Sequence, residues 1–314
     1  MYNKVIDMIS KSSKIGVFMH INPDADSIGS SIALKLALEK LGKEVVLFCS
    51  EDIHENYSFM NIEKHYKNIT SEKKFDLAIL LDCPSYNRID SYNHFTKIKN
   101  KIVIDHHLNN VIKADAKIVD IKSGCTGVLI YRLIKMMDIR FDKDICTCIY
   151  SAIVSDTGSF AYNNVTPEIF KISAECLENG IDNSQISYYL MTRKTRKQLK
   201  NFQEIISKFE FHNDIAICLI EYDFIKNSGN DSFDTFSALK FIDGVEGIKL
   251  FVLMTERNKN TFNISFRSRY IDTTIISTQF DGGGHASASG CVISGSGENI
   301  KSLLLSKAKD VING

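Results

Sequence analysis

The sequence lacks the long apolar segments that mark a membrane protein or a secreted precursor. No stretch approaches the roughly 18 apolar residues of a membrane span, and residues 1–12 are amphipathic without the apolar centre of a signal peptide. An excess charge of one sign is lacking too, because 38 basic and 38 acidic residues cancel. A neutral chain argues against sequence-blind binding to long nucleic acid, which relies on a basic surface. We therefore expect a cytoplasmic protein that contacts neither a membrane nor long duplex nucleic acid.

Several familiar catalytic and metal-binding motifs are lacking as well. The eight cysteines are scattered, mostly in apolar runs, and no Cys-x-x-Cys pair occurs. We expect reduced, buried thiols and no zinc site built from cysteines. The sequence contains no Gly-x-Ser-x-Gly around a nucleophilic serine and no Gly-x-x-x-x-Gly-Lys-Ser/Thr phosphate loop. These absences are consistent with a chemistry that needs no nucleophilic side chain.

The first half of the chain alternates strand and helix signals. Short apolar runs predict strands at 15–19, 44–49, 75–81 and 101–104. Helical spacing of apolar residues and good capping signals predict helices at 28–41, 127–137, 143–154 and 167–179. The near-continuous hydrophobicity of the strands is typical of a parallel sheet covered on both faces. We therefore expect residues 1–190 to form an α/β domain with a parallel sheet.

The second half predicts a smaller α/β domain at residues 212–314, joined to the first by a connecting helix at 191–211. Its signals are strands at 215–220, 249–255 and 261–266 and a closing helix at 297–312. Before it, residues 184–209 read as one continuous, increasingly charged helix with five basic residues inside eight positions, Arg193, Lys194, Arg196, Lys197 and Lys200. Such a run is typical of a solvated face, and a phosphate-steering surface is the alternative.

One stretch places three potential metal ligands between the first strand and the first helix of the sheet. His20, Asp24 and Asp26 lie there within seven residues. Ligands of open α/β sheets bind outside the carboxyl ends of the strands, and oxygen donors with one imidazole suit manganese or iron. The alternative is that Asp24 and Asp26 only form a turn and cap the helix.

Three further groups of this kind end apolar runs, namely Asp82, Asp105-His106-His107 and Asp156. Several carboxylates gathered at one edge of a sheet repel one another strongly unless cations neutralise them. The potential ligands exceed what one ion can use, so we expect two metal ions. A pair of ions about 3.5–4 Å apart serves phosphoryl transfer by generating hydroxide and neutralising phosphate charge.

A glycine run near the C-terminus is a candidate anion site. Residues 282–284 are three glycines followed by His285, and such a backbone can turn its N–H groups toward a phosphate. The alternative is a plain tight turn. Arg267 and Arg269 follow a strand signal and offer forked donors that suit phosphate. If the strand continued, these two would share a face and Ser268 would point away.

Five of these motifs, in this order, resemble those of one protein family. His20-x-Asn22-Pro23-Asp24-x-Asp26, Asp82, Asp105-His106-His107 and Ser155-Asp156-Thr157-Gly158 resemble the four motifs of the DHH phosphoesterase superfamily. Residues 282–290 resemble the signature of its associated C-terminal domain. The subgroup that the chain resembles contains nanoRNases and pAp phosphatases, which also include hydrolases of cyclic and linear dinucleotides.

The resemblance implies a role for each matching residue. His20, Asp24 and Asp82 would bind one Mn²⁺, while Asp26, Asp82, His106 and Asp156 would bind a second, with Mg²⁺ or Co²⁺ as substitutes. His107 would face the scissile phosphate, and Asp105 would orient the neighbouring histidines. The substrate's other phosphate or base would be held by Arg267, Ser268, Gly283, Gly284 and His285.

The resemblance also implies an overall arrangement and an activity. The active site would lie in the cleft between the two domains of a homodimeric protein. The expected activity is hydrolysis of nanoRNA or linear and cyclic dinucleotides to mononucleotides, and of 3'-phosphoadenosine 5'-phosphate (pAp) to AMP. Two departures bear on substrate preference: Asp281 stands where the family often has glycine, and the spacer after His285 is the small pair Ala286-Ser287.

Two other functions remain as alternatives at this point. A family-II inorganic pyrophosphatase shares the four N-terminal motifs, but it has a Ser-Arg-Lys-Gln-like motif near its C-terminus and no Gly-Gly-Gly-His domain. Here Arg196-Lys197-Gln198 lies in the connecting helix. A non-catalytic nucleotide sensor would need a replaced ligand position, and none is replaced.

Overall fold

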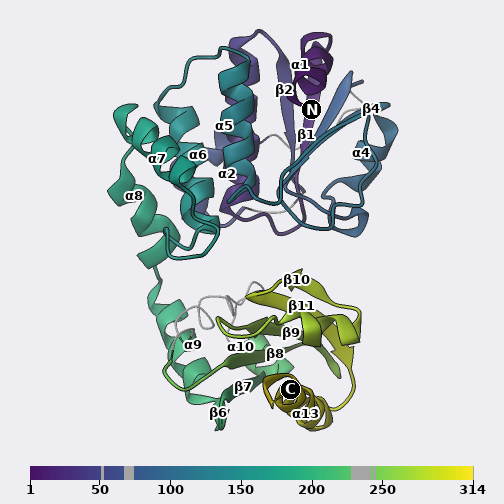
Figure 1. Ribbon diagram of the computed structural model, residues 1–314, viewed down its shortest axis with the longest axis vertical. Helices are drawn as coiled ribbons and strands as arrows, with labels where there is room; N and C mark the ends of the chain where they lie inside the picture. The colour runs from purple at the N-terminus through teal and green to yellow at the C-terminus, as the bar shows by residue number, and fades with distance from the viewer. Residues whose placement is uncertain (51–52, 67–73, 228–241, 243–244, 314) are drawn as a thin grey trace. The chain divides into compact units, whose positions relative to one another are not determined.

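A computed structural model describes residues 1–50, 53–66, 74–227, 242 and 245–313 of the chain. It divides into two compact units, Met1–Arg193 and Lys194–Gly314 (Figure 1). None of the helices in the described ranges is long and apolar enough to cross a membrane.

The first unit is built on a parallel five-stranded sheet. The strand order is β2 (Glu44–Phe48), β1 (Lys14–Phe18), β3 (Leu77–Leu81), β4 (Asn100–Asp105) and β5 (Ala116–Val119). Every neighbouring pair is parallel, which confirms the predicted α/β fold. The sequence prediction missed β5, because this short strand alternates buried and half-buried residues and includes Lys117.

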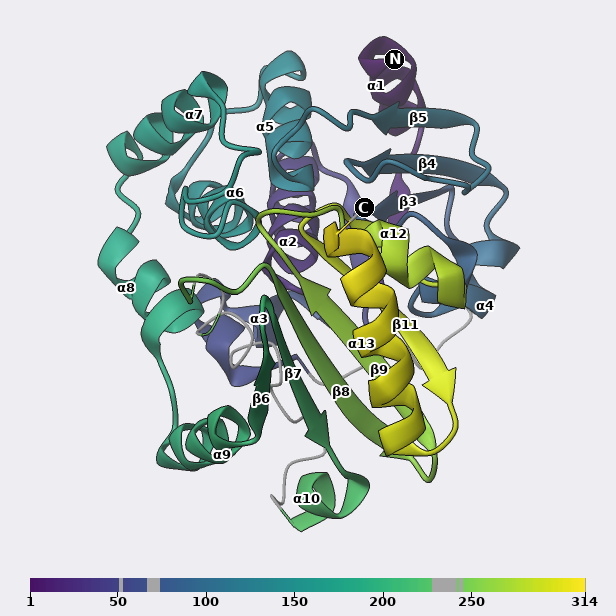
Figure 2. The same cartoon turned by 60° about the horizontal axis from the view of Figure 1, so that its bottom comes forward.

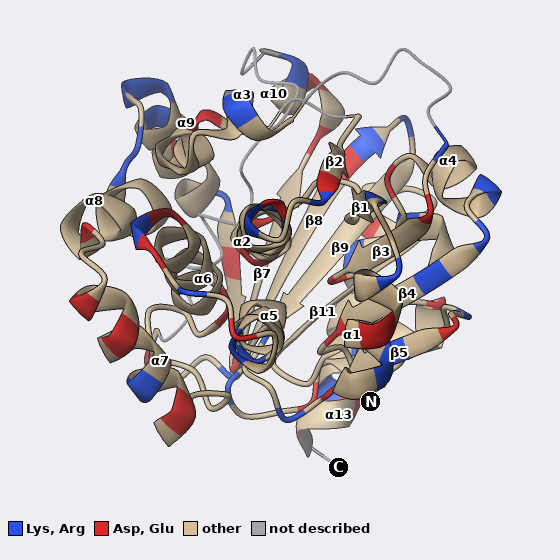
Figure 3. Ribbon diagram, turned by 90° about the horizontal axis from the view of Figure 1, so that it is seen from above, with Lys and Arg blue, Asp and Glu red and all other residues tan. Residues whose placement is uncertain are grey.

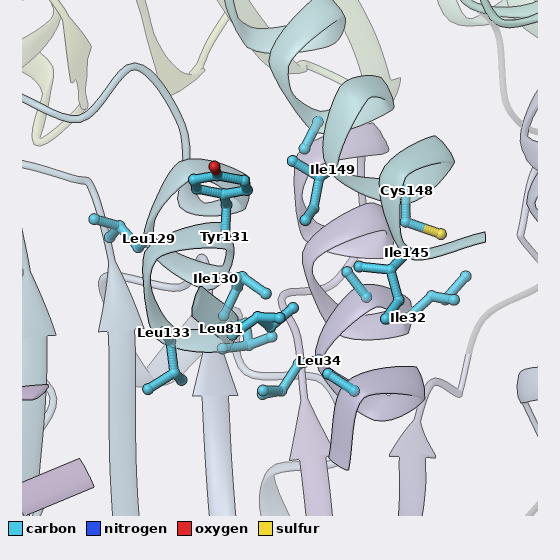
Figure 4. Packing of buried hydrophobic residues seen from close by; sticks show 14 of the residues in the cluster. Ile32, Leu34, Leu81, Leu129, Ile130, Tyr131, Leu133, Ile145, Cys148 and Ile149 are labelled. Atoms are coloured by element: carbon cyan, nitrogen blue, oxygen red, sulfur yellow. The ribbon is translucent and has the colours of Figure 1, made fainter. Parts of the chain in front are cut away.

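Both faces of this sheet are covered, which explains why its strands are apolar throughout. One layer contains α1 (Tyr2–Ser10), α2 (Ala25–Lys40), α5 (Thr126–Met136) and α6 (Lys143–Asp156). Figure 4 shows Leu34 of α2 and Leu133 of α5 gathered near Leu81 of β3 in this layer. Alternate strand residues such as Phe18 and Leu80 point the other way and pack with Phe95 of α4 (Tyr92–Lys97).

The end of the first unit differs from the single helix predicted for 184–209. After α7 (Pro167–Glu178), the chain forms α8 (Asn183–Ser187) and a π-helical turn at Tyr188–Thr192. The helix then stops, and a new one, α9 (Arg196–Ser207), begins. The hydroxyl of Thr195 accepts the N–H of Gln198, whose side chain accepts the N–H of Thr195. This reciprocal capping box starts a helix rather than continuing one, so the prediction of one helix was wrong.

The second unit is built on a six-stranded mixed sheet. The strand order is β10 (Gly283–His285), β11 (Ala288–Ser294), β9 (Thr261–Arg267), β8 (Leu250–Asn258), β7 (Ile215–Ile220) and β6 (Phe209–His212). Only β7 and β8 are parallel neighbours among these strands. Helix α13 (Gly297–Asn313) covers one face of the sheet (Figure 2). Helices α9 and α10 (Tyr222–Asn227) pack on the other face.

Two details of the second unit correct the sequence prediction. The glycine run does not make a turn, since Gly283 and Gly284 pair with β11 as the edge strand β10, and the turn lies at Ala286-Ser287. Strand β9 ends at Arg267, so strand geometry does not put Arg269 on the same face as Arg267. A run of glycines has no side-chain period, which is why its strand pairing left no signal in the sequence.

Candidate metal centre

The carboxyl ends of three neighbouring strands bring the candidate ligands of the first unit together. β1 is followed by Met19 and His20, β3 by Asp82, and β4 ends at Asp105. Because these strands are parallel, their ends meet at the same edge of the sheet. Figure 3 shows this unit from above, with α2 and α5 to the left of β1 and β3. Asp156 reaches the edge as the last residue of α6.

Asp82 lies between two histidines at this edge. The Nε2 atom of His20 is 3.5 Å from Asp82 Oδ2 and 3.9 Å from Asp24 Oδ1. The Nε2 atom of His106 is 3.5 Å from the other oxygen of the same carboxylate, Asp82 Oδ1. One oxygen of Asp82 therefore faces each histidine, which is the arrangement of a carboxylate that bridges two ions.

A second group of ligand atoms surrounds His106. Its Nε2 atom is 3.3 Å from Asp156 Oδ2 and 3.8 Å from Asp26 Oδ2. Three overlapping sets of donor atoms, each set within 4.8 Å, could hold metal ions: His20, Asp24 and Asp82; Asp26, His106 and Asp156; and Asp82, His106 and His107. The structure thus brings together every metal ligand named from the sequence.

The electrostatics of this cluster fit bound cations. Burial, together with the nearby carboxylates of Asp24 and Asp82, raises the pKa of Asp156 to about 6, although a hydrogen bond with His106 lowers it. Burial also opposes ionisation of Asp82, but the His20 hydrogen bond and the charges of His106 and His107 outweigh it and lower the pKa of Asp82. Oxygen-rich donors with imidazole nitrogens are a set that Mn²⁺ accepts, so the residues present fit a pair of divalent ions.

Asp24 is placed for both roles that the sequence left open, a cap of α2 and a metal ligand. Its Oδ1 atom accepts the N–H groups of Asp26 and Ser27 at 3.0 Å, so it caps α2. The same carboxylate belongs to the donor set of His20 and Asp82. A capping carboxylate is held by backbone donors at a fixed position, and this fixes where a metal ligand would stand.

The amino end of α5 holds Asp26, and the sequence prediction missed it. The N–H groups of Thr126 and Gly127 donate to the two oxygens of Asp26 at 2.8 Å, and Ser30 adds its hydroxyl at 3.0 Å. The Thr126 hydroxyl also donates to Asp82 Oδ1 at 3.0 Å. Position 127 needs glycine, because a Cβ atom there would lie 2.6 Å from the Cβ atom of Ala152. The sequence signal that could have revealed this contact is the pair of glycines around the start of α5, Gly124 and Gly127.

His107 is held by a buried carboxylate. Its Nδ1 atom lies 2.7 Å from Asp105 Oδ1, and the side-chain amide of Asn110 donates to Asp105 Oδ2 at 2.7 Å. Asp105 is fully buried. An imidazole that donates through Nδ1 presents Nε2 to its surroundings, so Asp105 fixes which nitrogen of His107 can meet a substrate. Asn110 is a second residue that the sequence prediction missed.

The predicted substrate-binding residues lie at the β10–β11 hairpin and the end of β9 in the second unit. A Cβ atom at Gly283 would meet nothing within 4 Å, whereas one at Gly284 would lie 2.5 Å from the carbonyl oxygen of Ala288. Ser268 is buried, and its hydroxyl donates to the carbonyl of Lys249 at 2.6 Å. The structure thus leaves the backbone at Gly283 open, while the Ser268 hydroxyl supports the loop after β9.

Comparison with protein families identifies the first unit. Residues 14–153 match the model described as DHH family, N-terminal domain. This unit therefore contains the N-terminal domain of the DHH family of phosphoesterases. The matched range includes His20, Asp82 and His106, and it ends before Asp156. The structure nevertheless brings Asp156 into the same cluster, because its carboxylate lies 3.3 Å from Nε2 of His106.

Three proteins show the similarity of this chain to known sequences, two of them over most of its length and one over half. The bifunctional oligoribonuclease and PAP phosphatase NrnA of Thermus thermophilus is 26% identical over 90% of this chain and 84% of its own. The protein of the same name from Bacillus subtilis is 26% identical over 93% of each chain. A probable manganese-dependent inorganic pyrophosphatase of Enterococcus faecalis is 30% identical over 50% of this chain and 52% of its own.

A solved structure supports the fold of this DHH chain. The crystal structure of an exopolyphosphatase-related protein from Bacteroides fragilis superposes with a TM-score of 0.89. It covers 100% of this chain and 97% of that one at 24% sequence identity. At this level of identity the likeness establishes the fold alone.

Proposed function

We propose that this DHH-family phosphoesterase is manganese-dependent. Its substrates would be short oligonucleotides, including linear and cyclic dinucleotides, which it hydrolyses to mononucleotides, and pAp, which it hydrolyses to AMP. The observation that carries the proposal is the position of Asp82, with one oxygen toward His20 and the other toward His106. Two divalent ions held there would supply hydroxide near neutral pH and neutralise charge on the phosphate oxygens.

The chain's own side chains would position the ions and the phosphate. Asp82 would join the two ligand sets, while the N–H groups at the amino end of α5 hold both oxygens of the Asp26 carboxylate in a fixed orientation. His107, oriented by Asp105, would exchange a proton with the phosphate or the departing oxygen through Nε2. No nucleophilic side chain is required for this reaction.

Similarity to two oligoribonuclease and PAP phosphatases supports the choice of short nucleotides as substrates. The balanced net charge also suits short rather than long nucleic acid. In the second unit, Arg267, His285 and the open backbone at Gly283 would hold the substrate's other phosphate or base. We further propose, from the family resemblance, a cytoplasmic homodimer.

The direct test is turnover by the purified full-length protein with Mn²⁺. It should convert pApA to AMP, and pAp to AMP and phosphate. Asp82→Ala should abolish both reactions while the thermal unfolding of the metal-free protein stays close to that of the wild type. Asp310→Ala, at an exposed position of α13, is the matched control and should retain full activity. Turnover that survives in Asp82→Ala would contradict the two-ion assignment.

Inorganic pyrophosphate hydrolysis is a second candidate, favoured by the similar pyrophosphatase of Enterococcus faecalis. A competition assay with pApA, pGpG, pAp, cyclic di-AMP and pyrophosphate separates the two candidates. Rapid loss of pyrophosphate with intact nucleotides would select the pyrophosphatase. Nucleotide binding without turnover of any of these compounds would instead indicate a sensor.

A further inference from the structure

A backbone pairing holds Arg88 beside the candidate metal centre. Arg88 ends the 3₁₀ turn η2 (Tyr86–Arg88), which follows β3 and Asp82. Its carbonyl accepts the N–H of Ile21 at 2.8 Å, and His20 and Ile89 form an antiparallel bridge. The main chain at Arg88 is therefore fixed against the loop that carries His20.

The guanidinium of Arg88 and the imidazole of His20 are close, and the tautomer of His20 decides whether they form a hydrogen bond. The Nδ1 atom of His20 lies 2.8 Å from the carbonyl oxygen of Ile21 and 3.3 Å from Nη2 of Arg88. A carbonyl only accepts and a guanidinium only donates, so Nδ1 can satisfy one of them. A histidine that binds metal through Nε2 carries its proton on Nδ1. His20 would then donate to Ile21, and the Arg88 donors would face it without a bond.

The charge of Arg88 also bears on the balance of charge at the metal centre. Within the described ranges, no carboxylate forms an ion pair with Arg88. A cation beside a metal ligand disfavours binding of a second positive charge. The four carboxylates of Asp24, Asp26, Asp82 and Asp156 carry a charge equal and opposite to that of two divalent ions, so a further positive charge nearby would add to the attraction of an incoming phosphate.

We propose that Arg88 binds a phosphate oxygen of the substrate on the His20 side of the metal centre. This inference rests on the proposed function and names a residue that would recognise the phosphate. The planar guanidinium offers paired donors that match phosphate oxygens. It also supplies a positive charge beside the metal centre, and its main chain is already held in place by Ile21.

Binding of the product AMP to the Mn²⁺-loaded protein tests this role without turnover. Isothermal titration calorimetry should show AMP binding weakened about 10- to 100-fold in Arg88→Gln, the range for a lost charge-assisted hydrogen bond. The AMP affinity of Arg88→Lys should lie between those of the wild type and Arg88→Gln, because lysine keeps the positive charge but lacks the paired donors of the guanidinium. Arg140→Gln, at an exposed arginine elsewhere in the first unit, should match the wild type.

Two further measurements separate phosphate binding from structural support of His20. The affinity for Mn²⁺ should be unchanged or higher in Arg88→Gln, and the KM for pAp should rise more than kcat falls. Weaker Mn²⁺ binding in Arg88→Gln, or AMP binding equal to that of the wild type, would overturn the proposal. Failure of the wild type to hydrolyse any nucleotide would overturn the proposed function, while the AMP affinities would still decide the role of Arg88.

Discussion

Asp156 shows how one residue at the cluster links metal binding to stability. Burial and the charges of Asp24 and Asp82 raise its pKa from 3.8 to about 6, because its ionised form is the unfavourable one in the absence of a cation. A bound ion reverses this preference, since a coordinating carboxylate is ionised. The same side chain thus destabilises the metal-free protein, and as a ligand it would strengthen the metal complex.

The metal-free protein should therefore lose stability as the pH rises. A carboxyl group whose pKa is raised in the folded state binds its proton more tightly there than in the unfolded chain. The contribution of this proton to the free energy of unfolding is fully present below pH 3.8. It is lost as the pH rises past about 6, and the loss amounts to about 3 kcal/mol. Urea unfolding of EDTA-treated protein should show a lower free energy of unfolding at pH 7.5 than at pH 5.

Asp156→Asn is the matched variant for this measurement. It removes the titrating group while keeping the shape of the side chain, so the loss of stability between pH 5 and 7.5 should shrink. Saturating Mn²⁺ should restore the free energy of unfolding of the wild type at pH 7.5 and change that of the variant little. An equal pH dependence in both proteins would show that Asp156 does not titrate in this range.

At the scale of elements, the amino end of α5 organises the centre from the helical layer. It donates two N–H groups to Asp26, about 100 positions earlier in the sequence, and one hydroxyl to Asp82, 44 positions earlier. Helix α5 packs closely on α6 at this point, and that packing depends on Gly127. The carboxyl ends of the strands supply His20, Asp82 and His106, and the amino end of α5 sets the orientation of Asp26.

Gly127→Ala should therefore weaken metal binding as well as stability. The added methyl group meets Ala152 at 2.6 Å, and separating the helices would move the N–H groups away from Asp26. We expect a loss of about 1–3 kcal/mol in the free energy of unfolding, which is typical of overpacking, and a lower affinity for Mn²⁺ in a calorimetric titration.

A second glycine controls for the loss of stability alone. Gly42 has φ +73° after the end of α2, and a Cβ atom there would meet nothing within 4 Å. Gly42→Ala should cost about 1 kcal/mol through backbone strain and leave the affinity for Mn²⁺ unchanged. If Gly127→Ala also bound Mn²⁺ like the wild type, the amino end of α5 would have no part in the site.

The elements differ in how far the sequence predicted them, for physical reasons. The strands of the first unit are buried on both faces, so their continuous hydrophobicity marked β1 to β4, and their ends marked His20, Asp82 and the Asp105 cluster. Contacts such as Thr126 to Asp26 join residues that are distant in sequence and follow no period. The break before α9 depended on a capping box at Thr195 and Gln198, which the helical charge pattern concealed.

At the scale of the whole molecule, each unit has hydrophobic cores of its own. Among the described residues, two core clusters lie within the first unit and two within the second. Within the described residues, every candidate group of metal ligands belongs to the first unit. A ligand stabilises the structure that binds it, and units with separate cores can unfold separately.

Mn²⁺ should therefore protect one unit and not the other against hydrogen exchange. At about 100 times its dissociation constant, the ion adds about 2.7 kcal/mol to the unit that binds it. The slowest amides of β1, β3 and β4 should then exchange about 100-fold more slowly, while those of β7, β8 and β9 should keep their rates. Hydrogen-exchange mass spectrometry with Mn²⁺ and with EDTA resolves the two sets of strands.

Two variants test the two sites in the same experiment. Asp82→Ala should abolish the added protection in the first unit, because it removes the carboxylate shared by both ligand sets. Gly283→Ala should retain the added protection of the first unit, because position 283 lies in the second unit and has open space around it. The KM of this variant for a dinucleotide should nevertheless rise if the backbone there approaches the substrate. Equal added protection of β3 and β8 in the wild type would contradict separate unfolding, since metal bound at Asp82 would then stabilise both sheets as one.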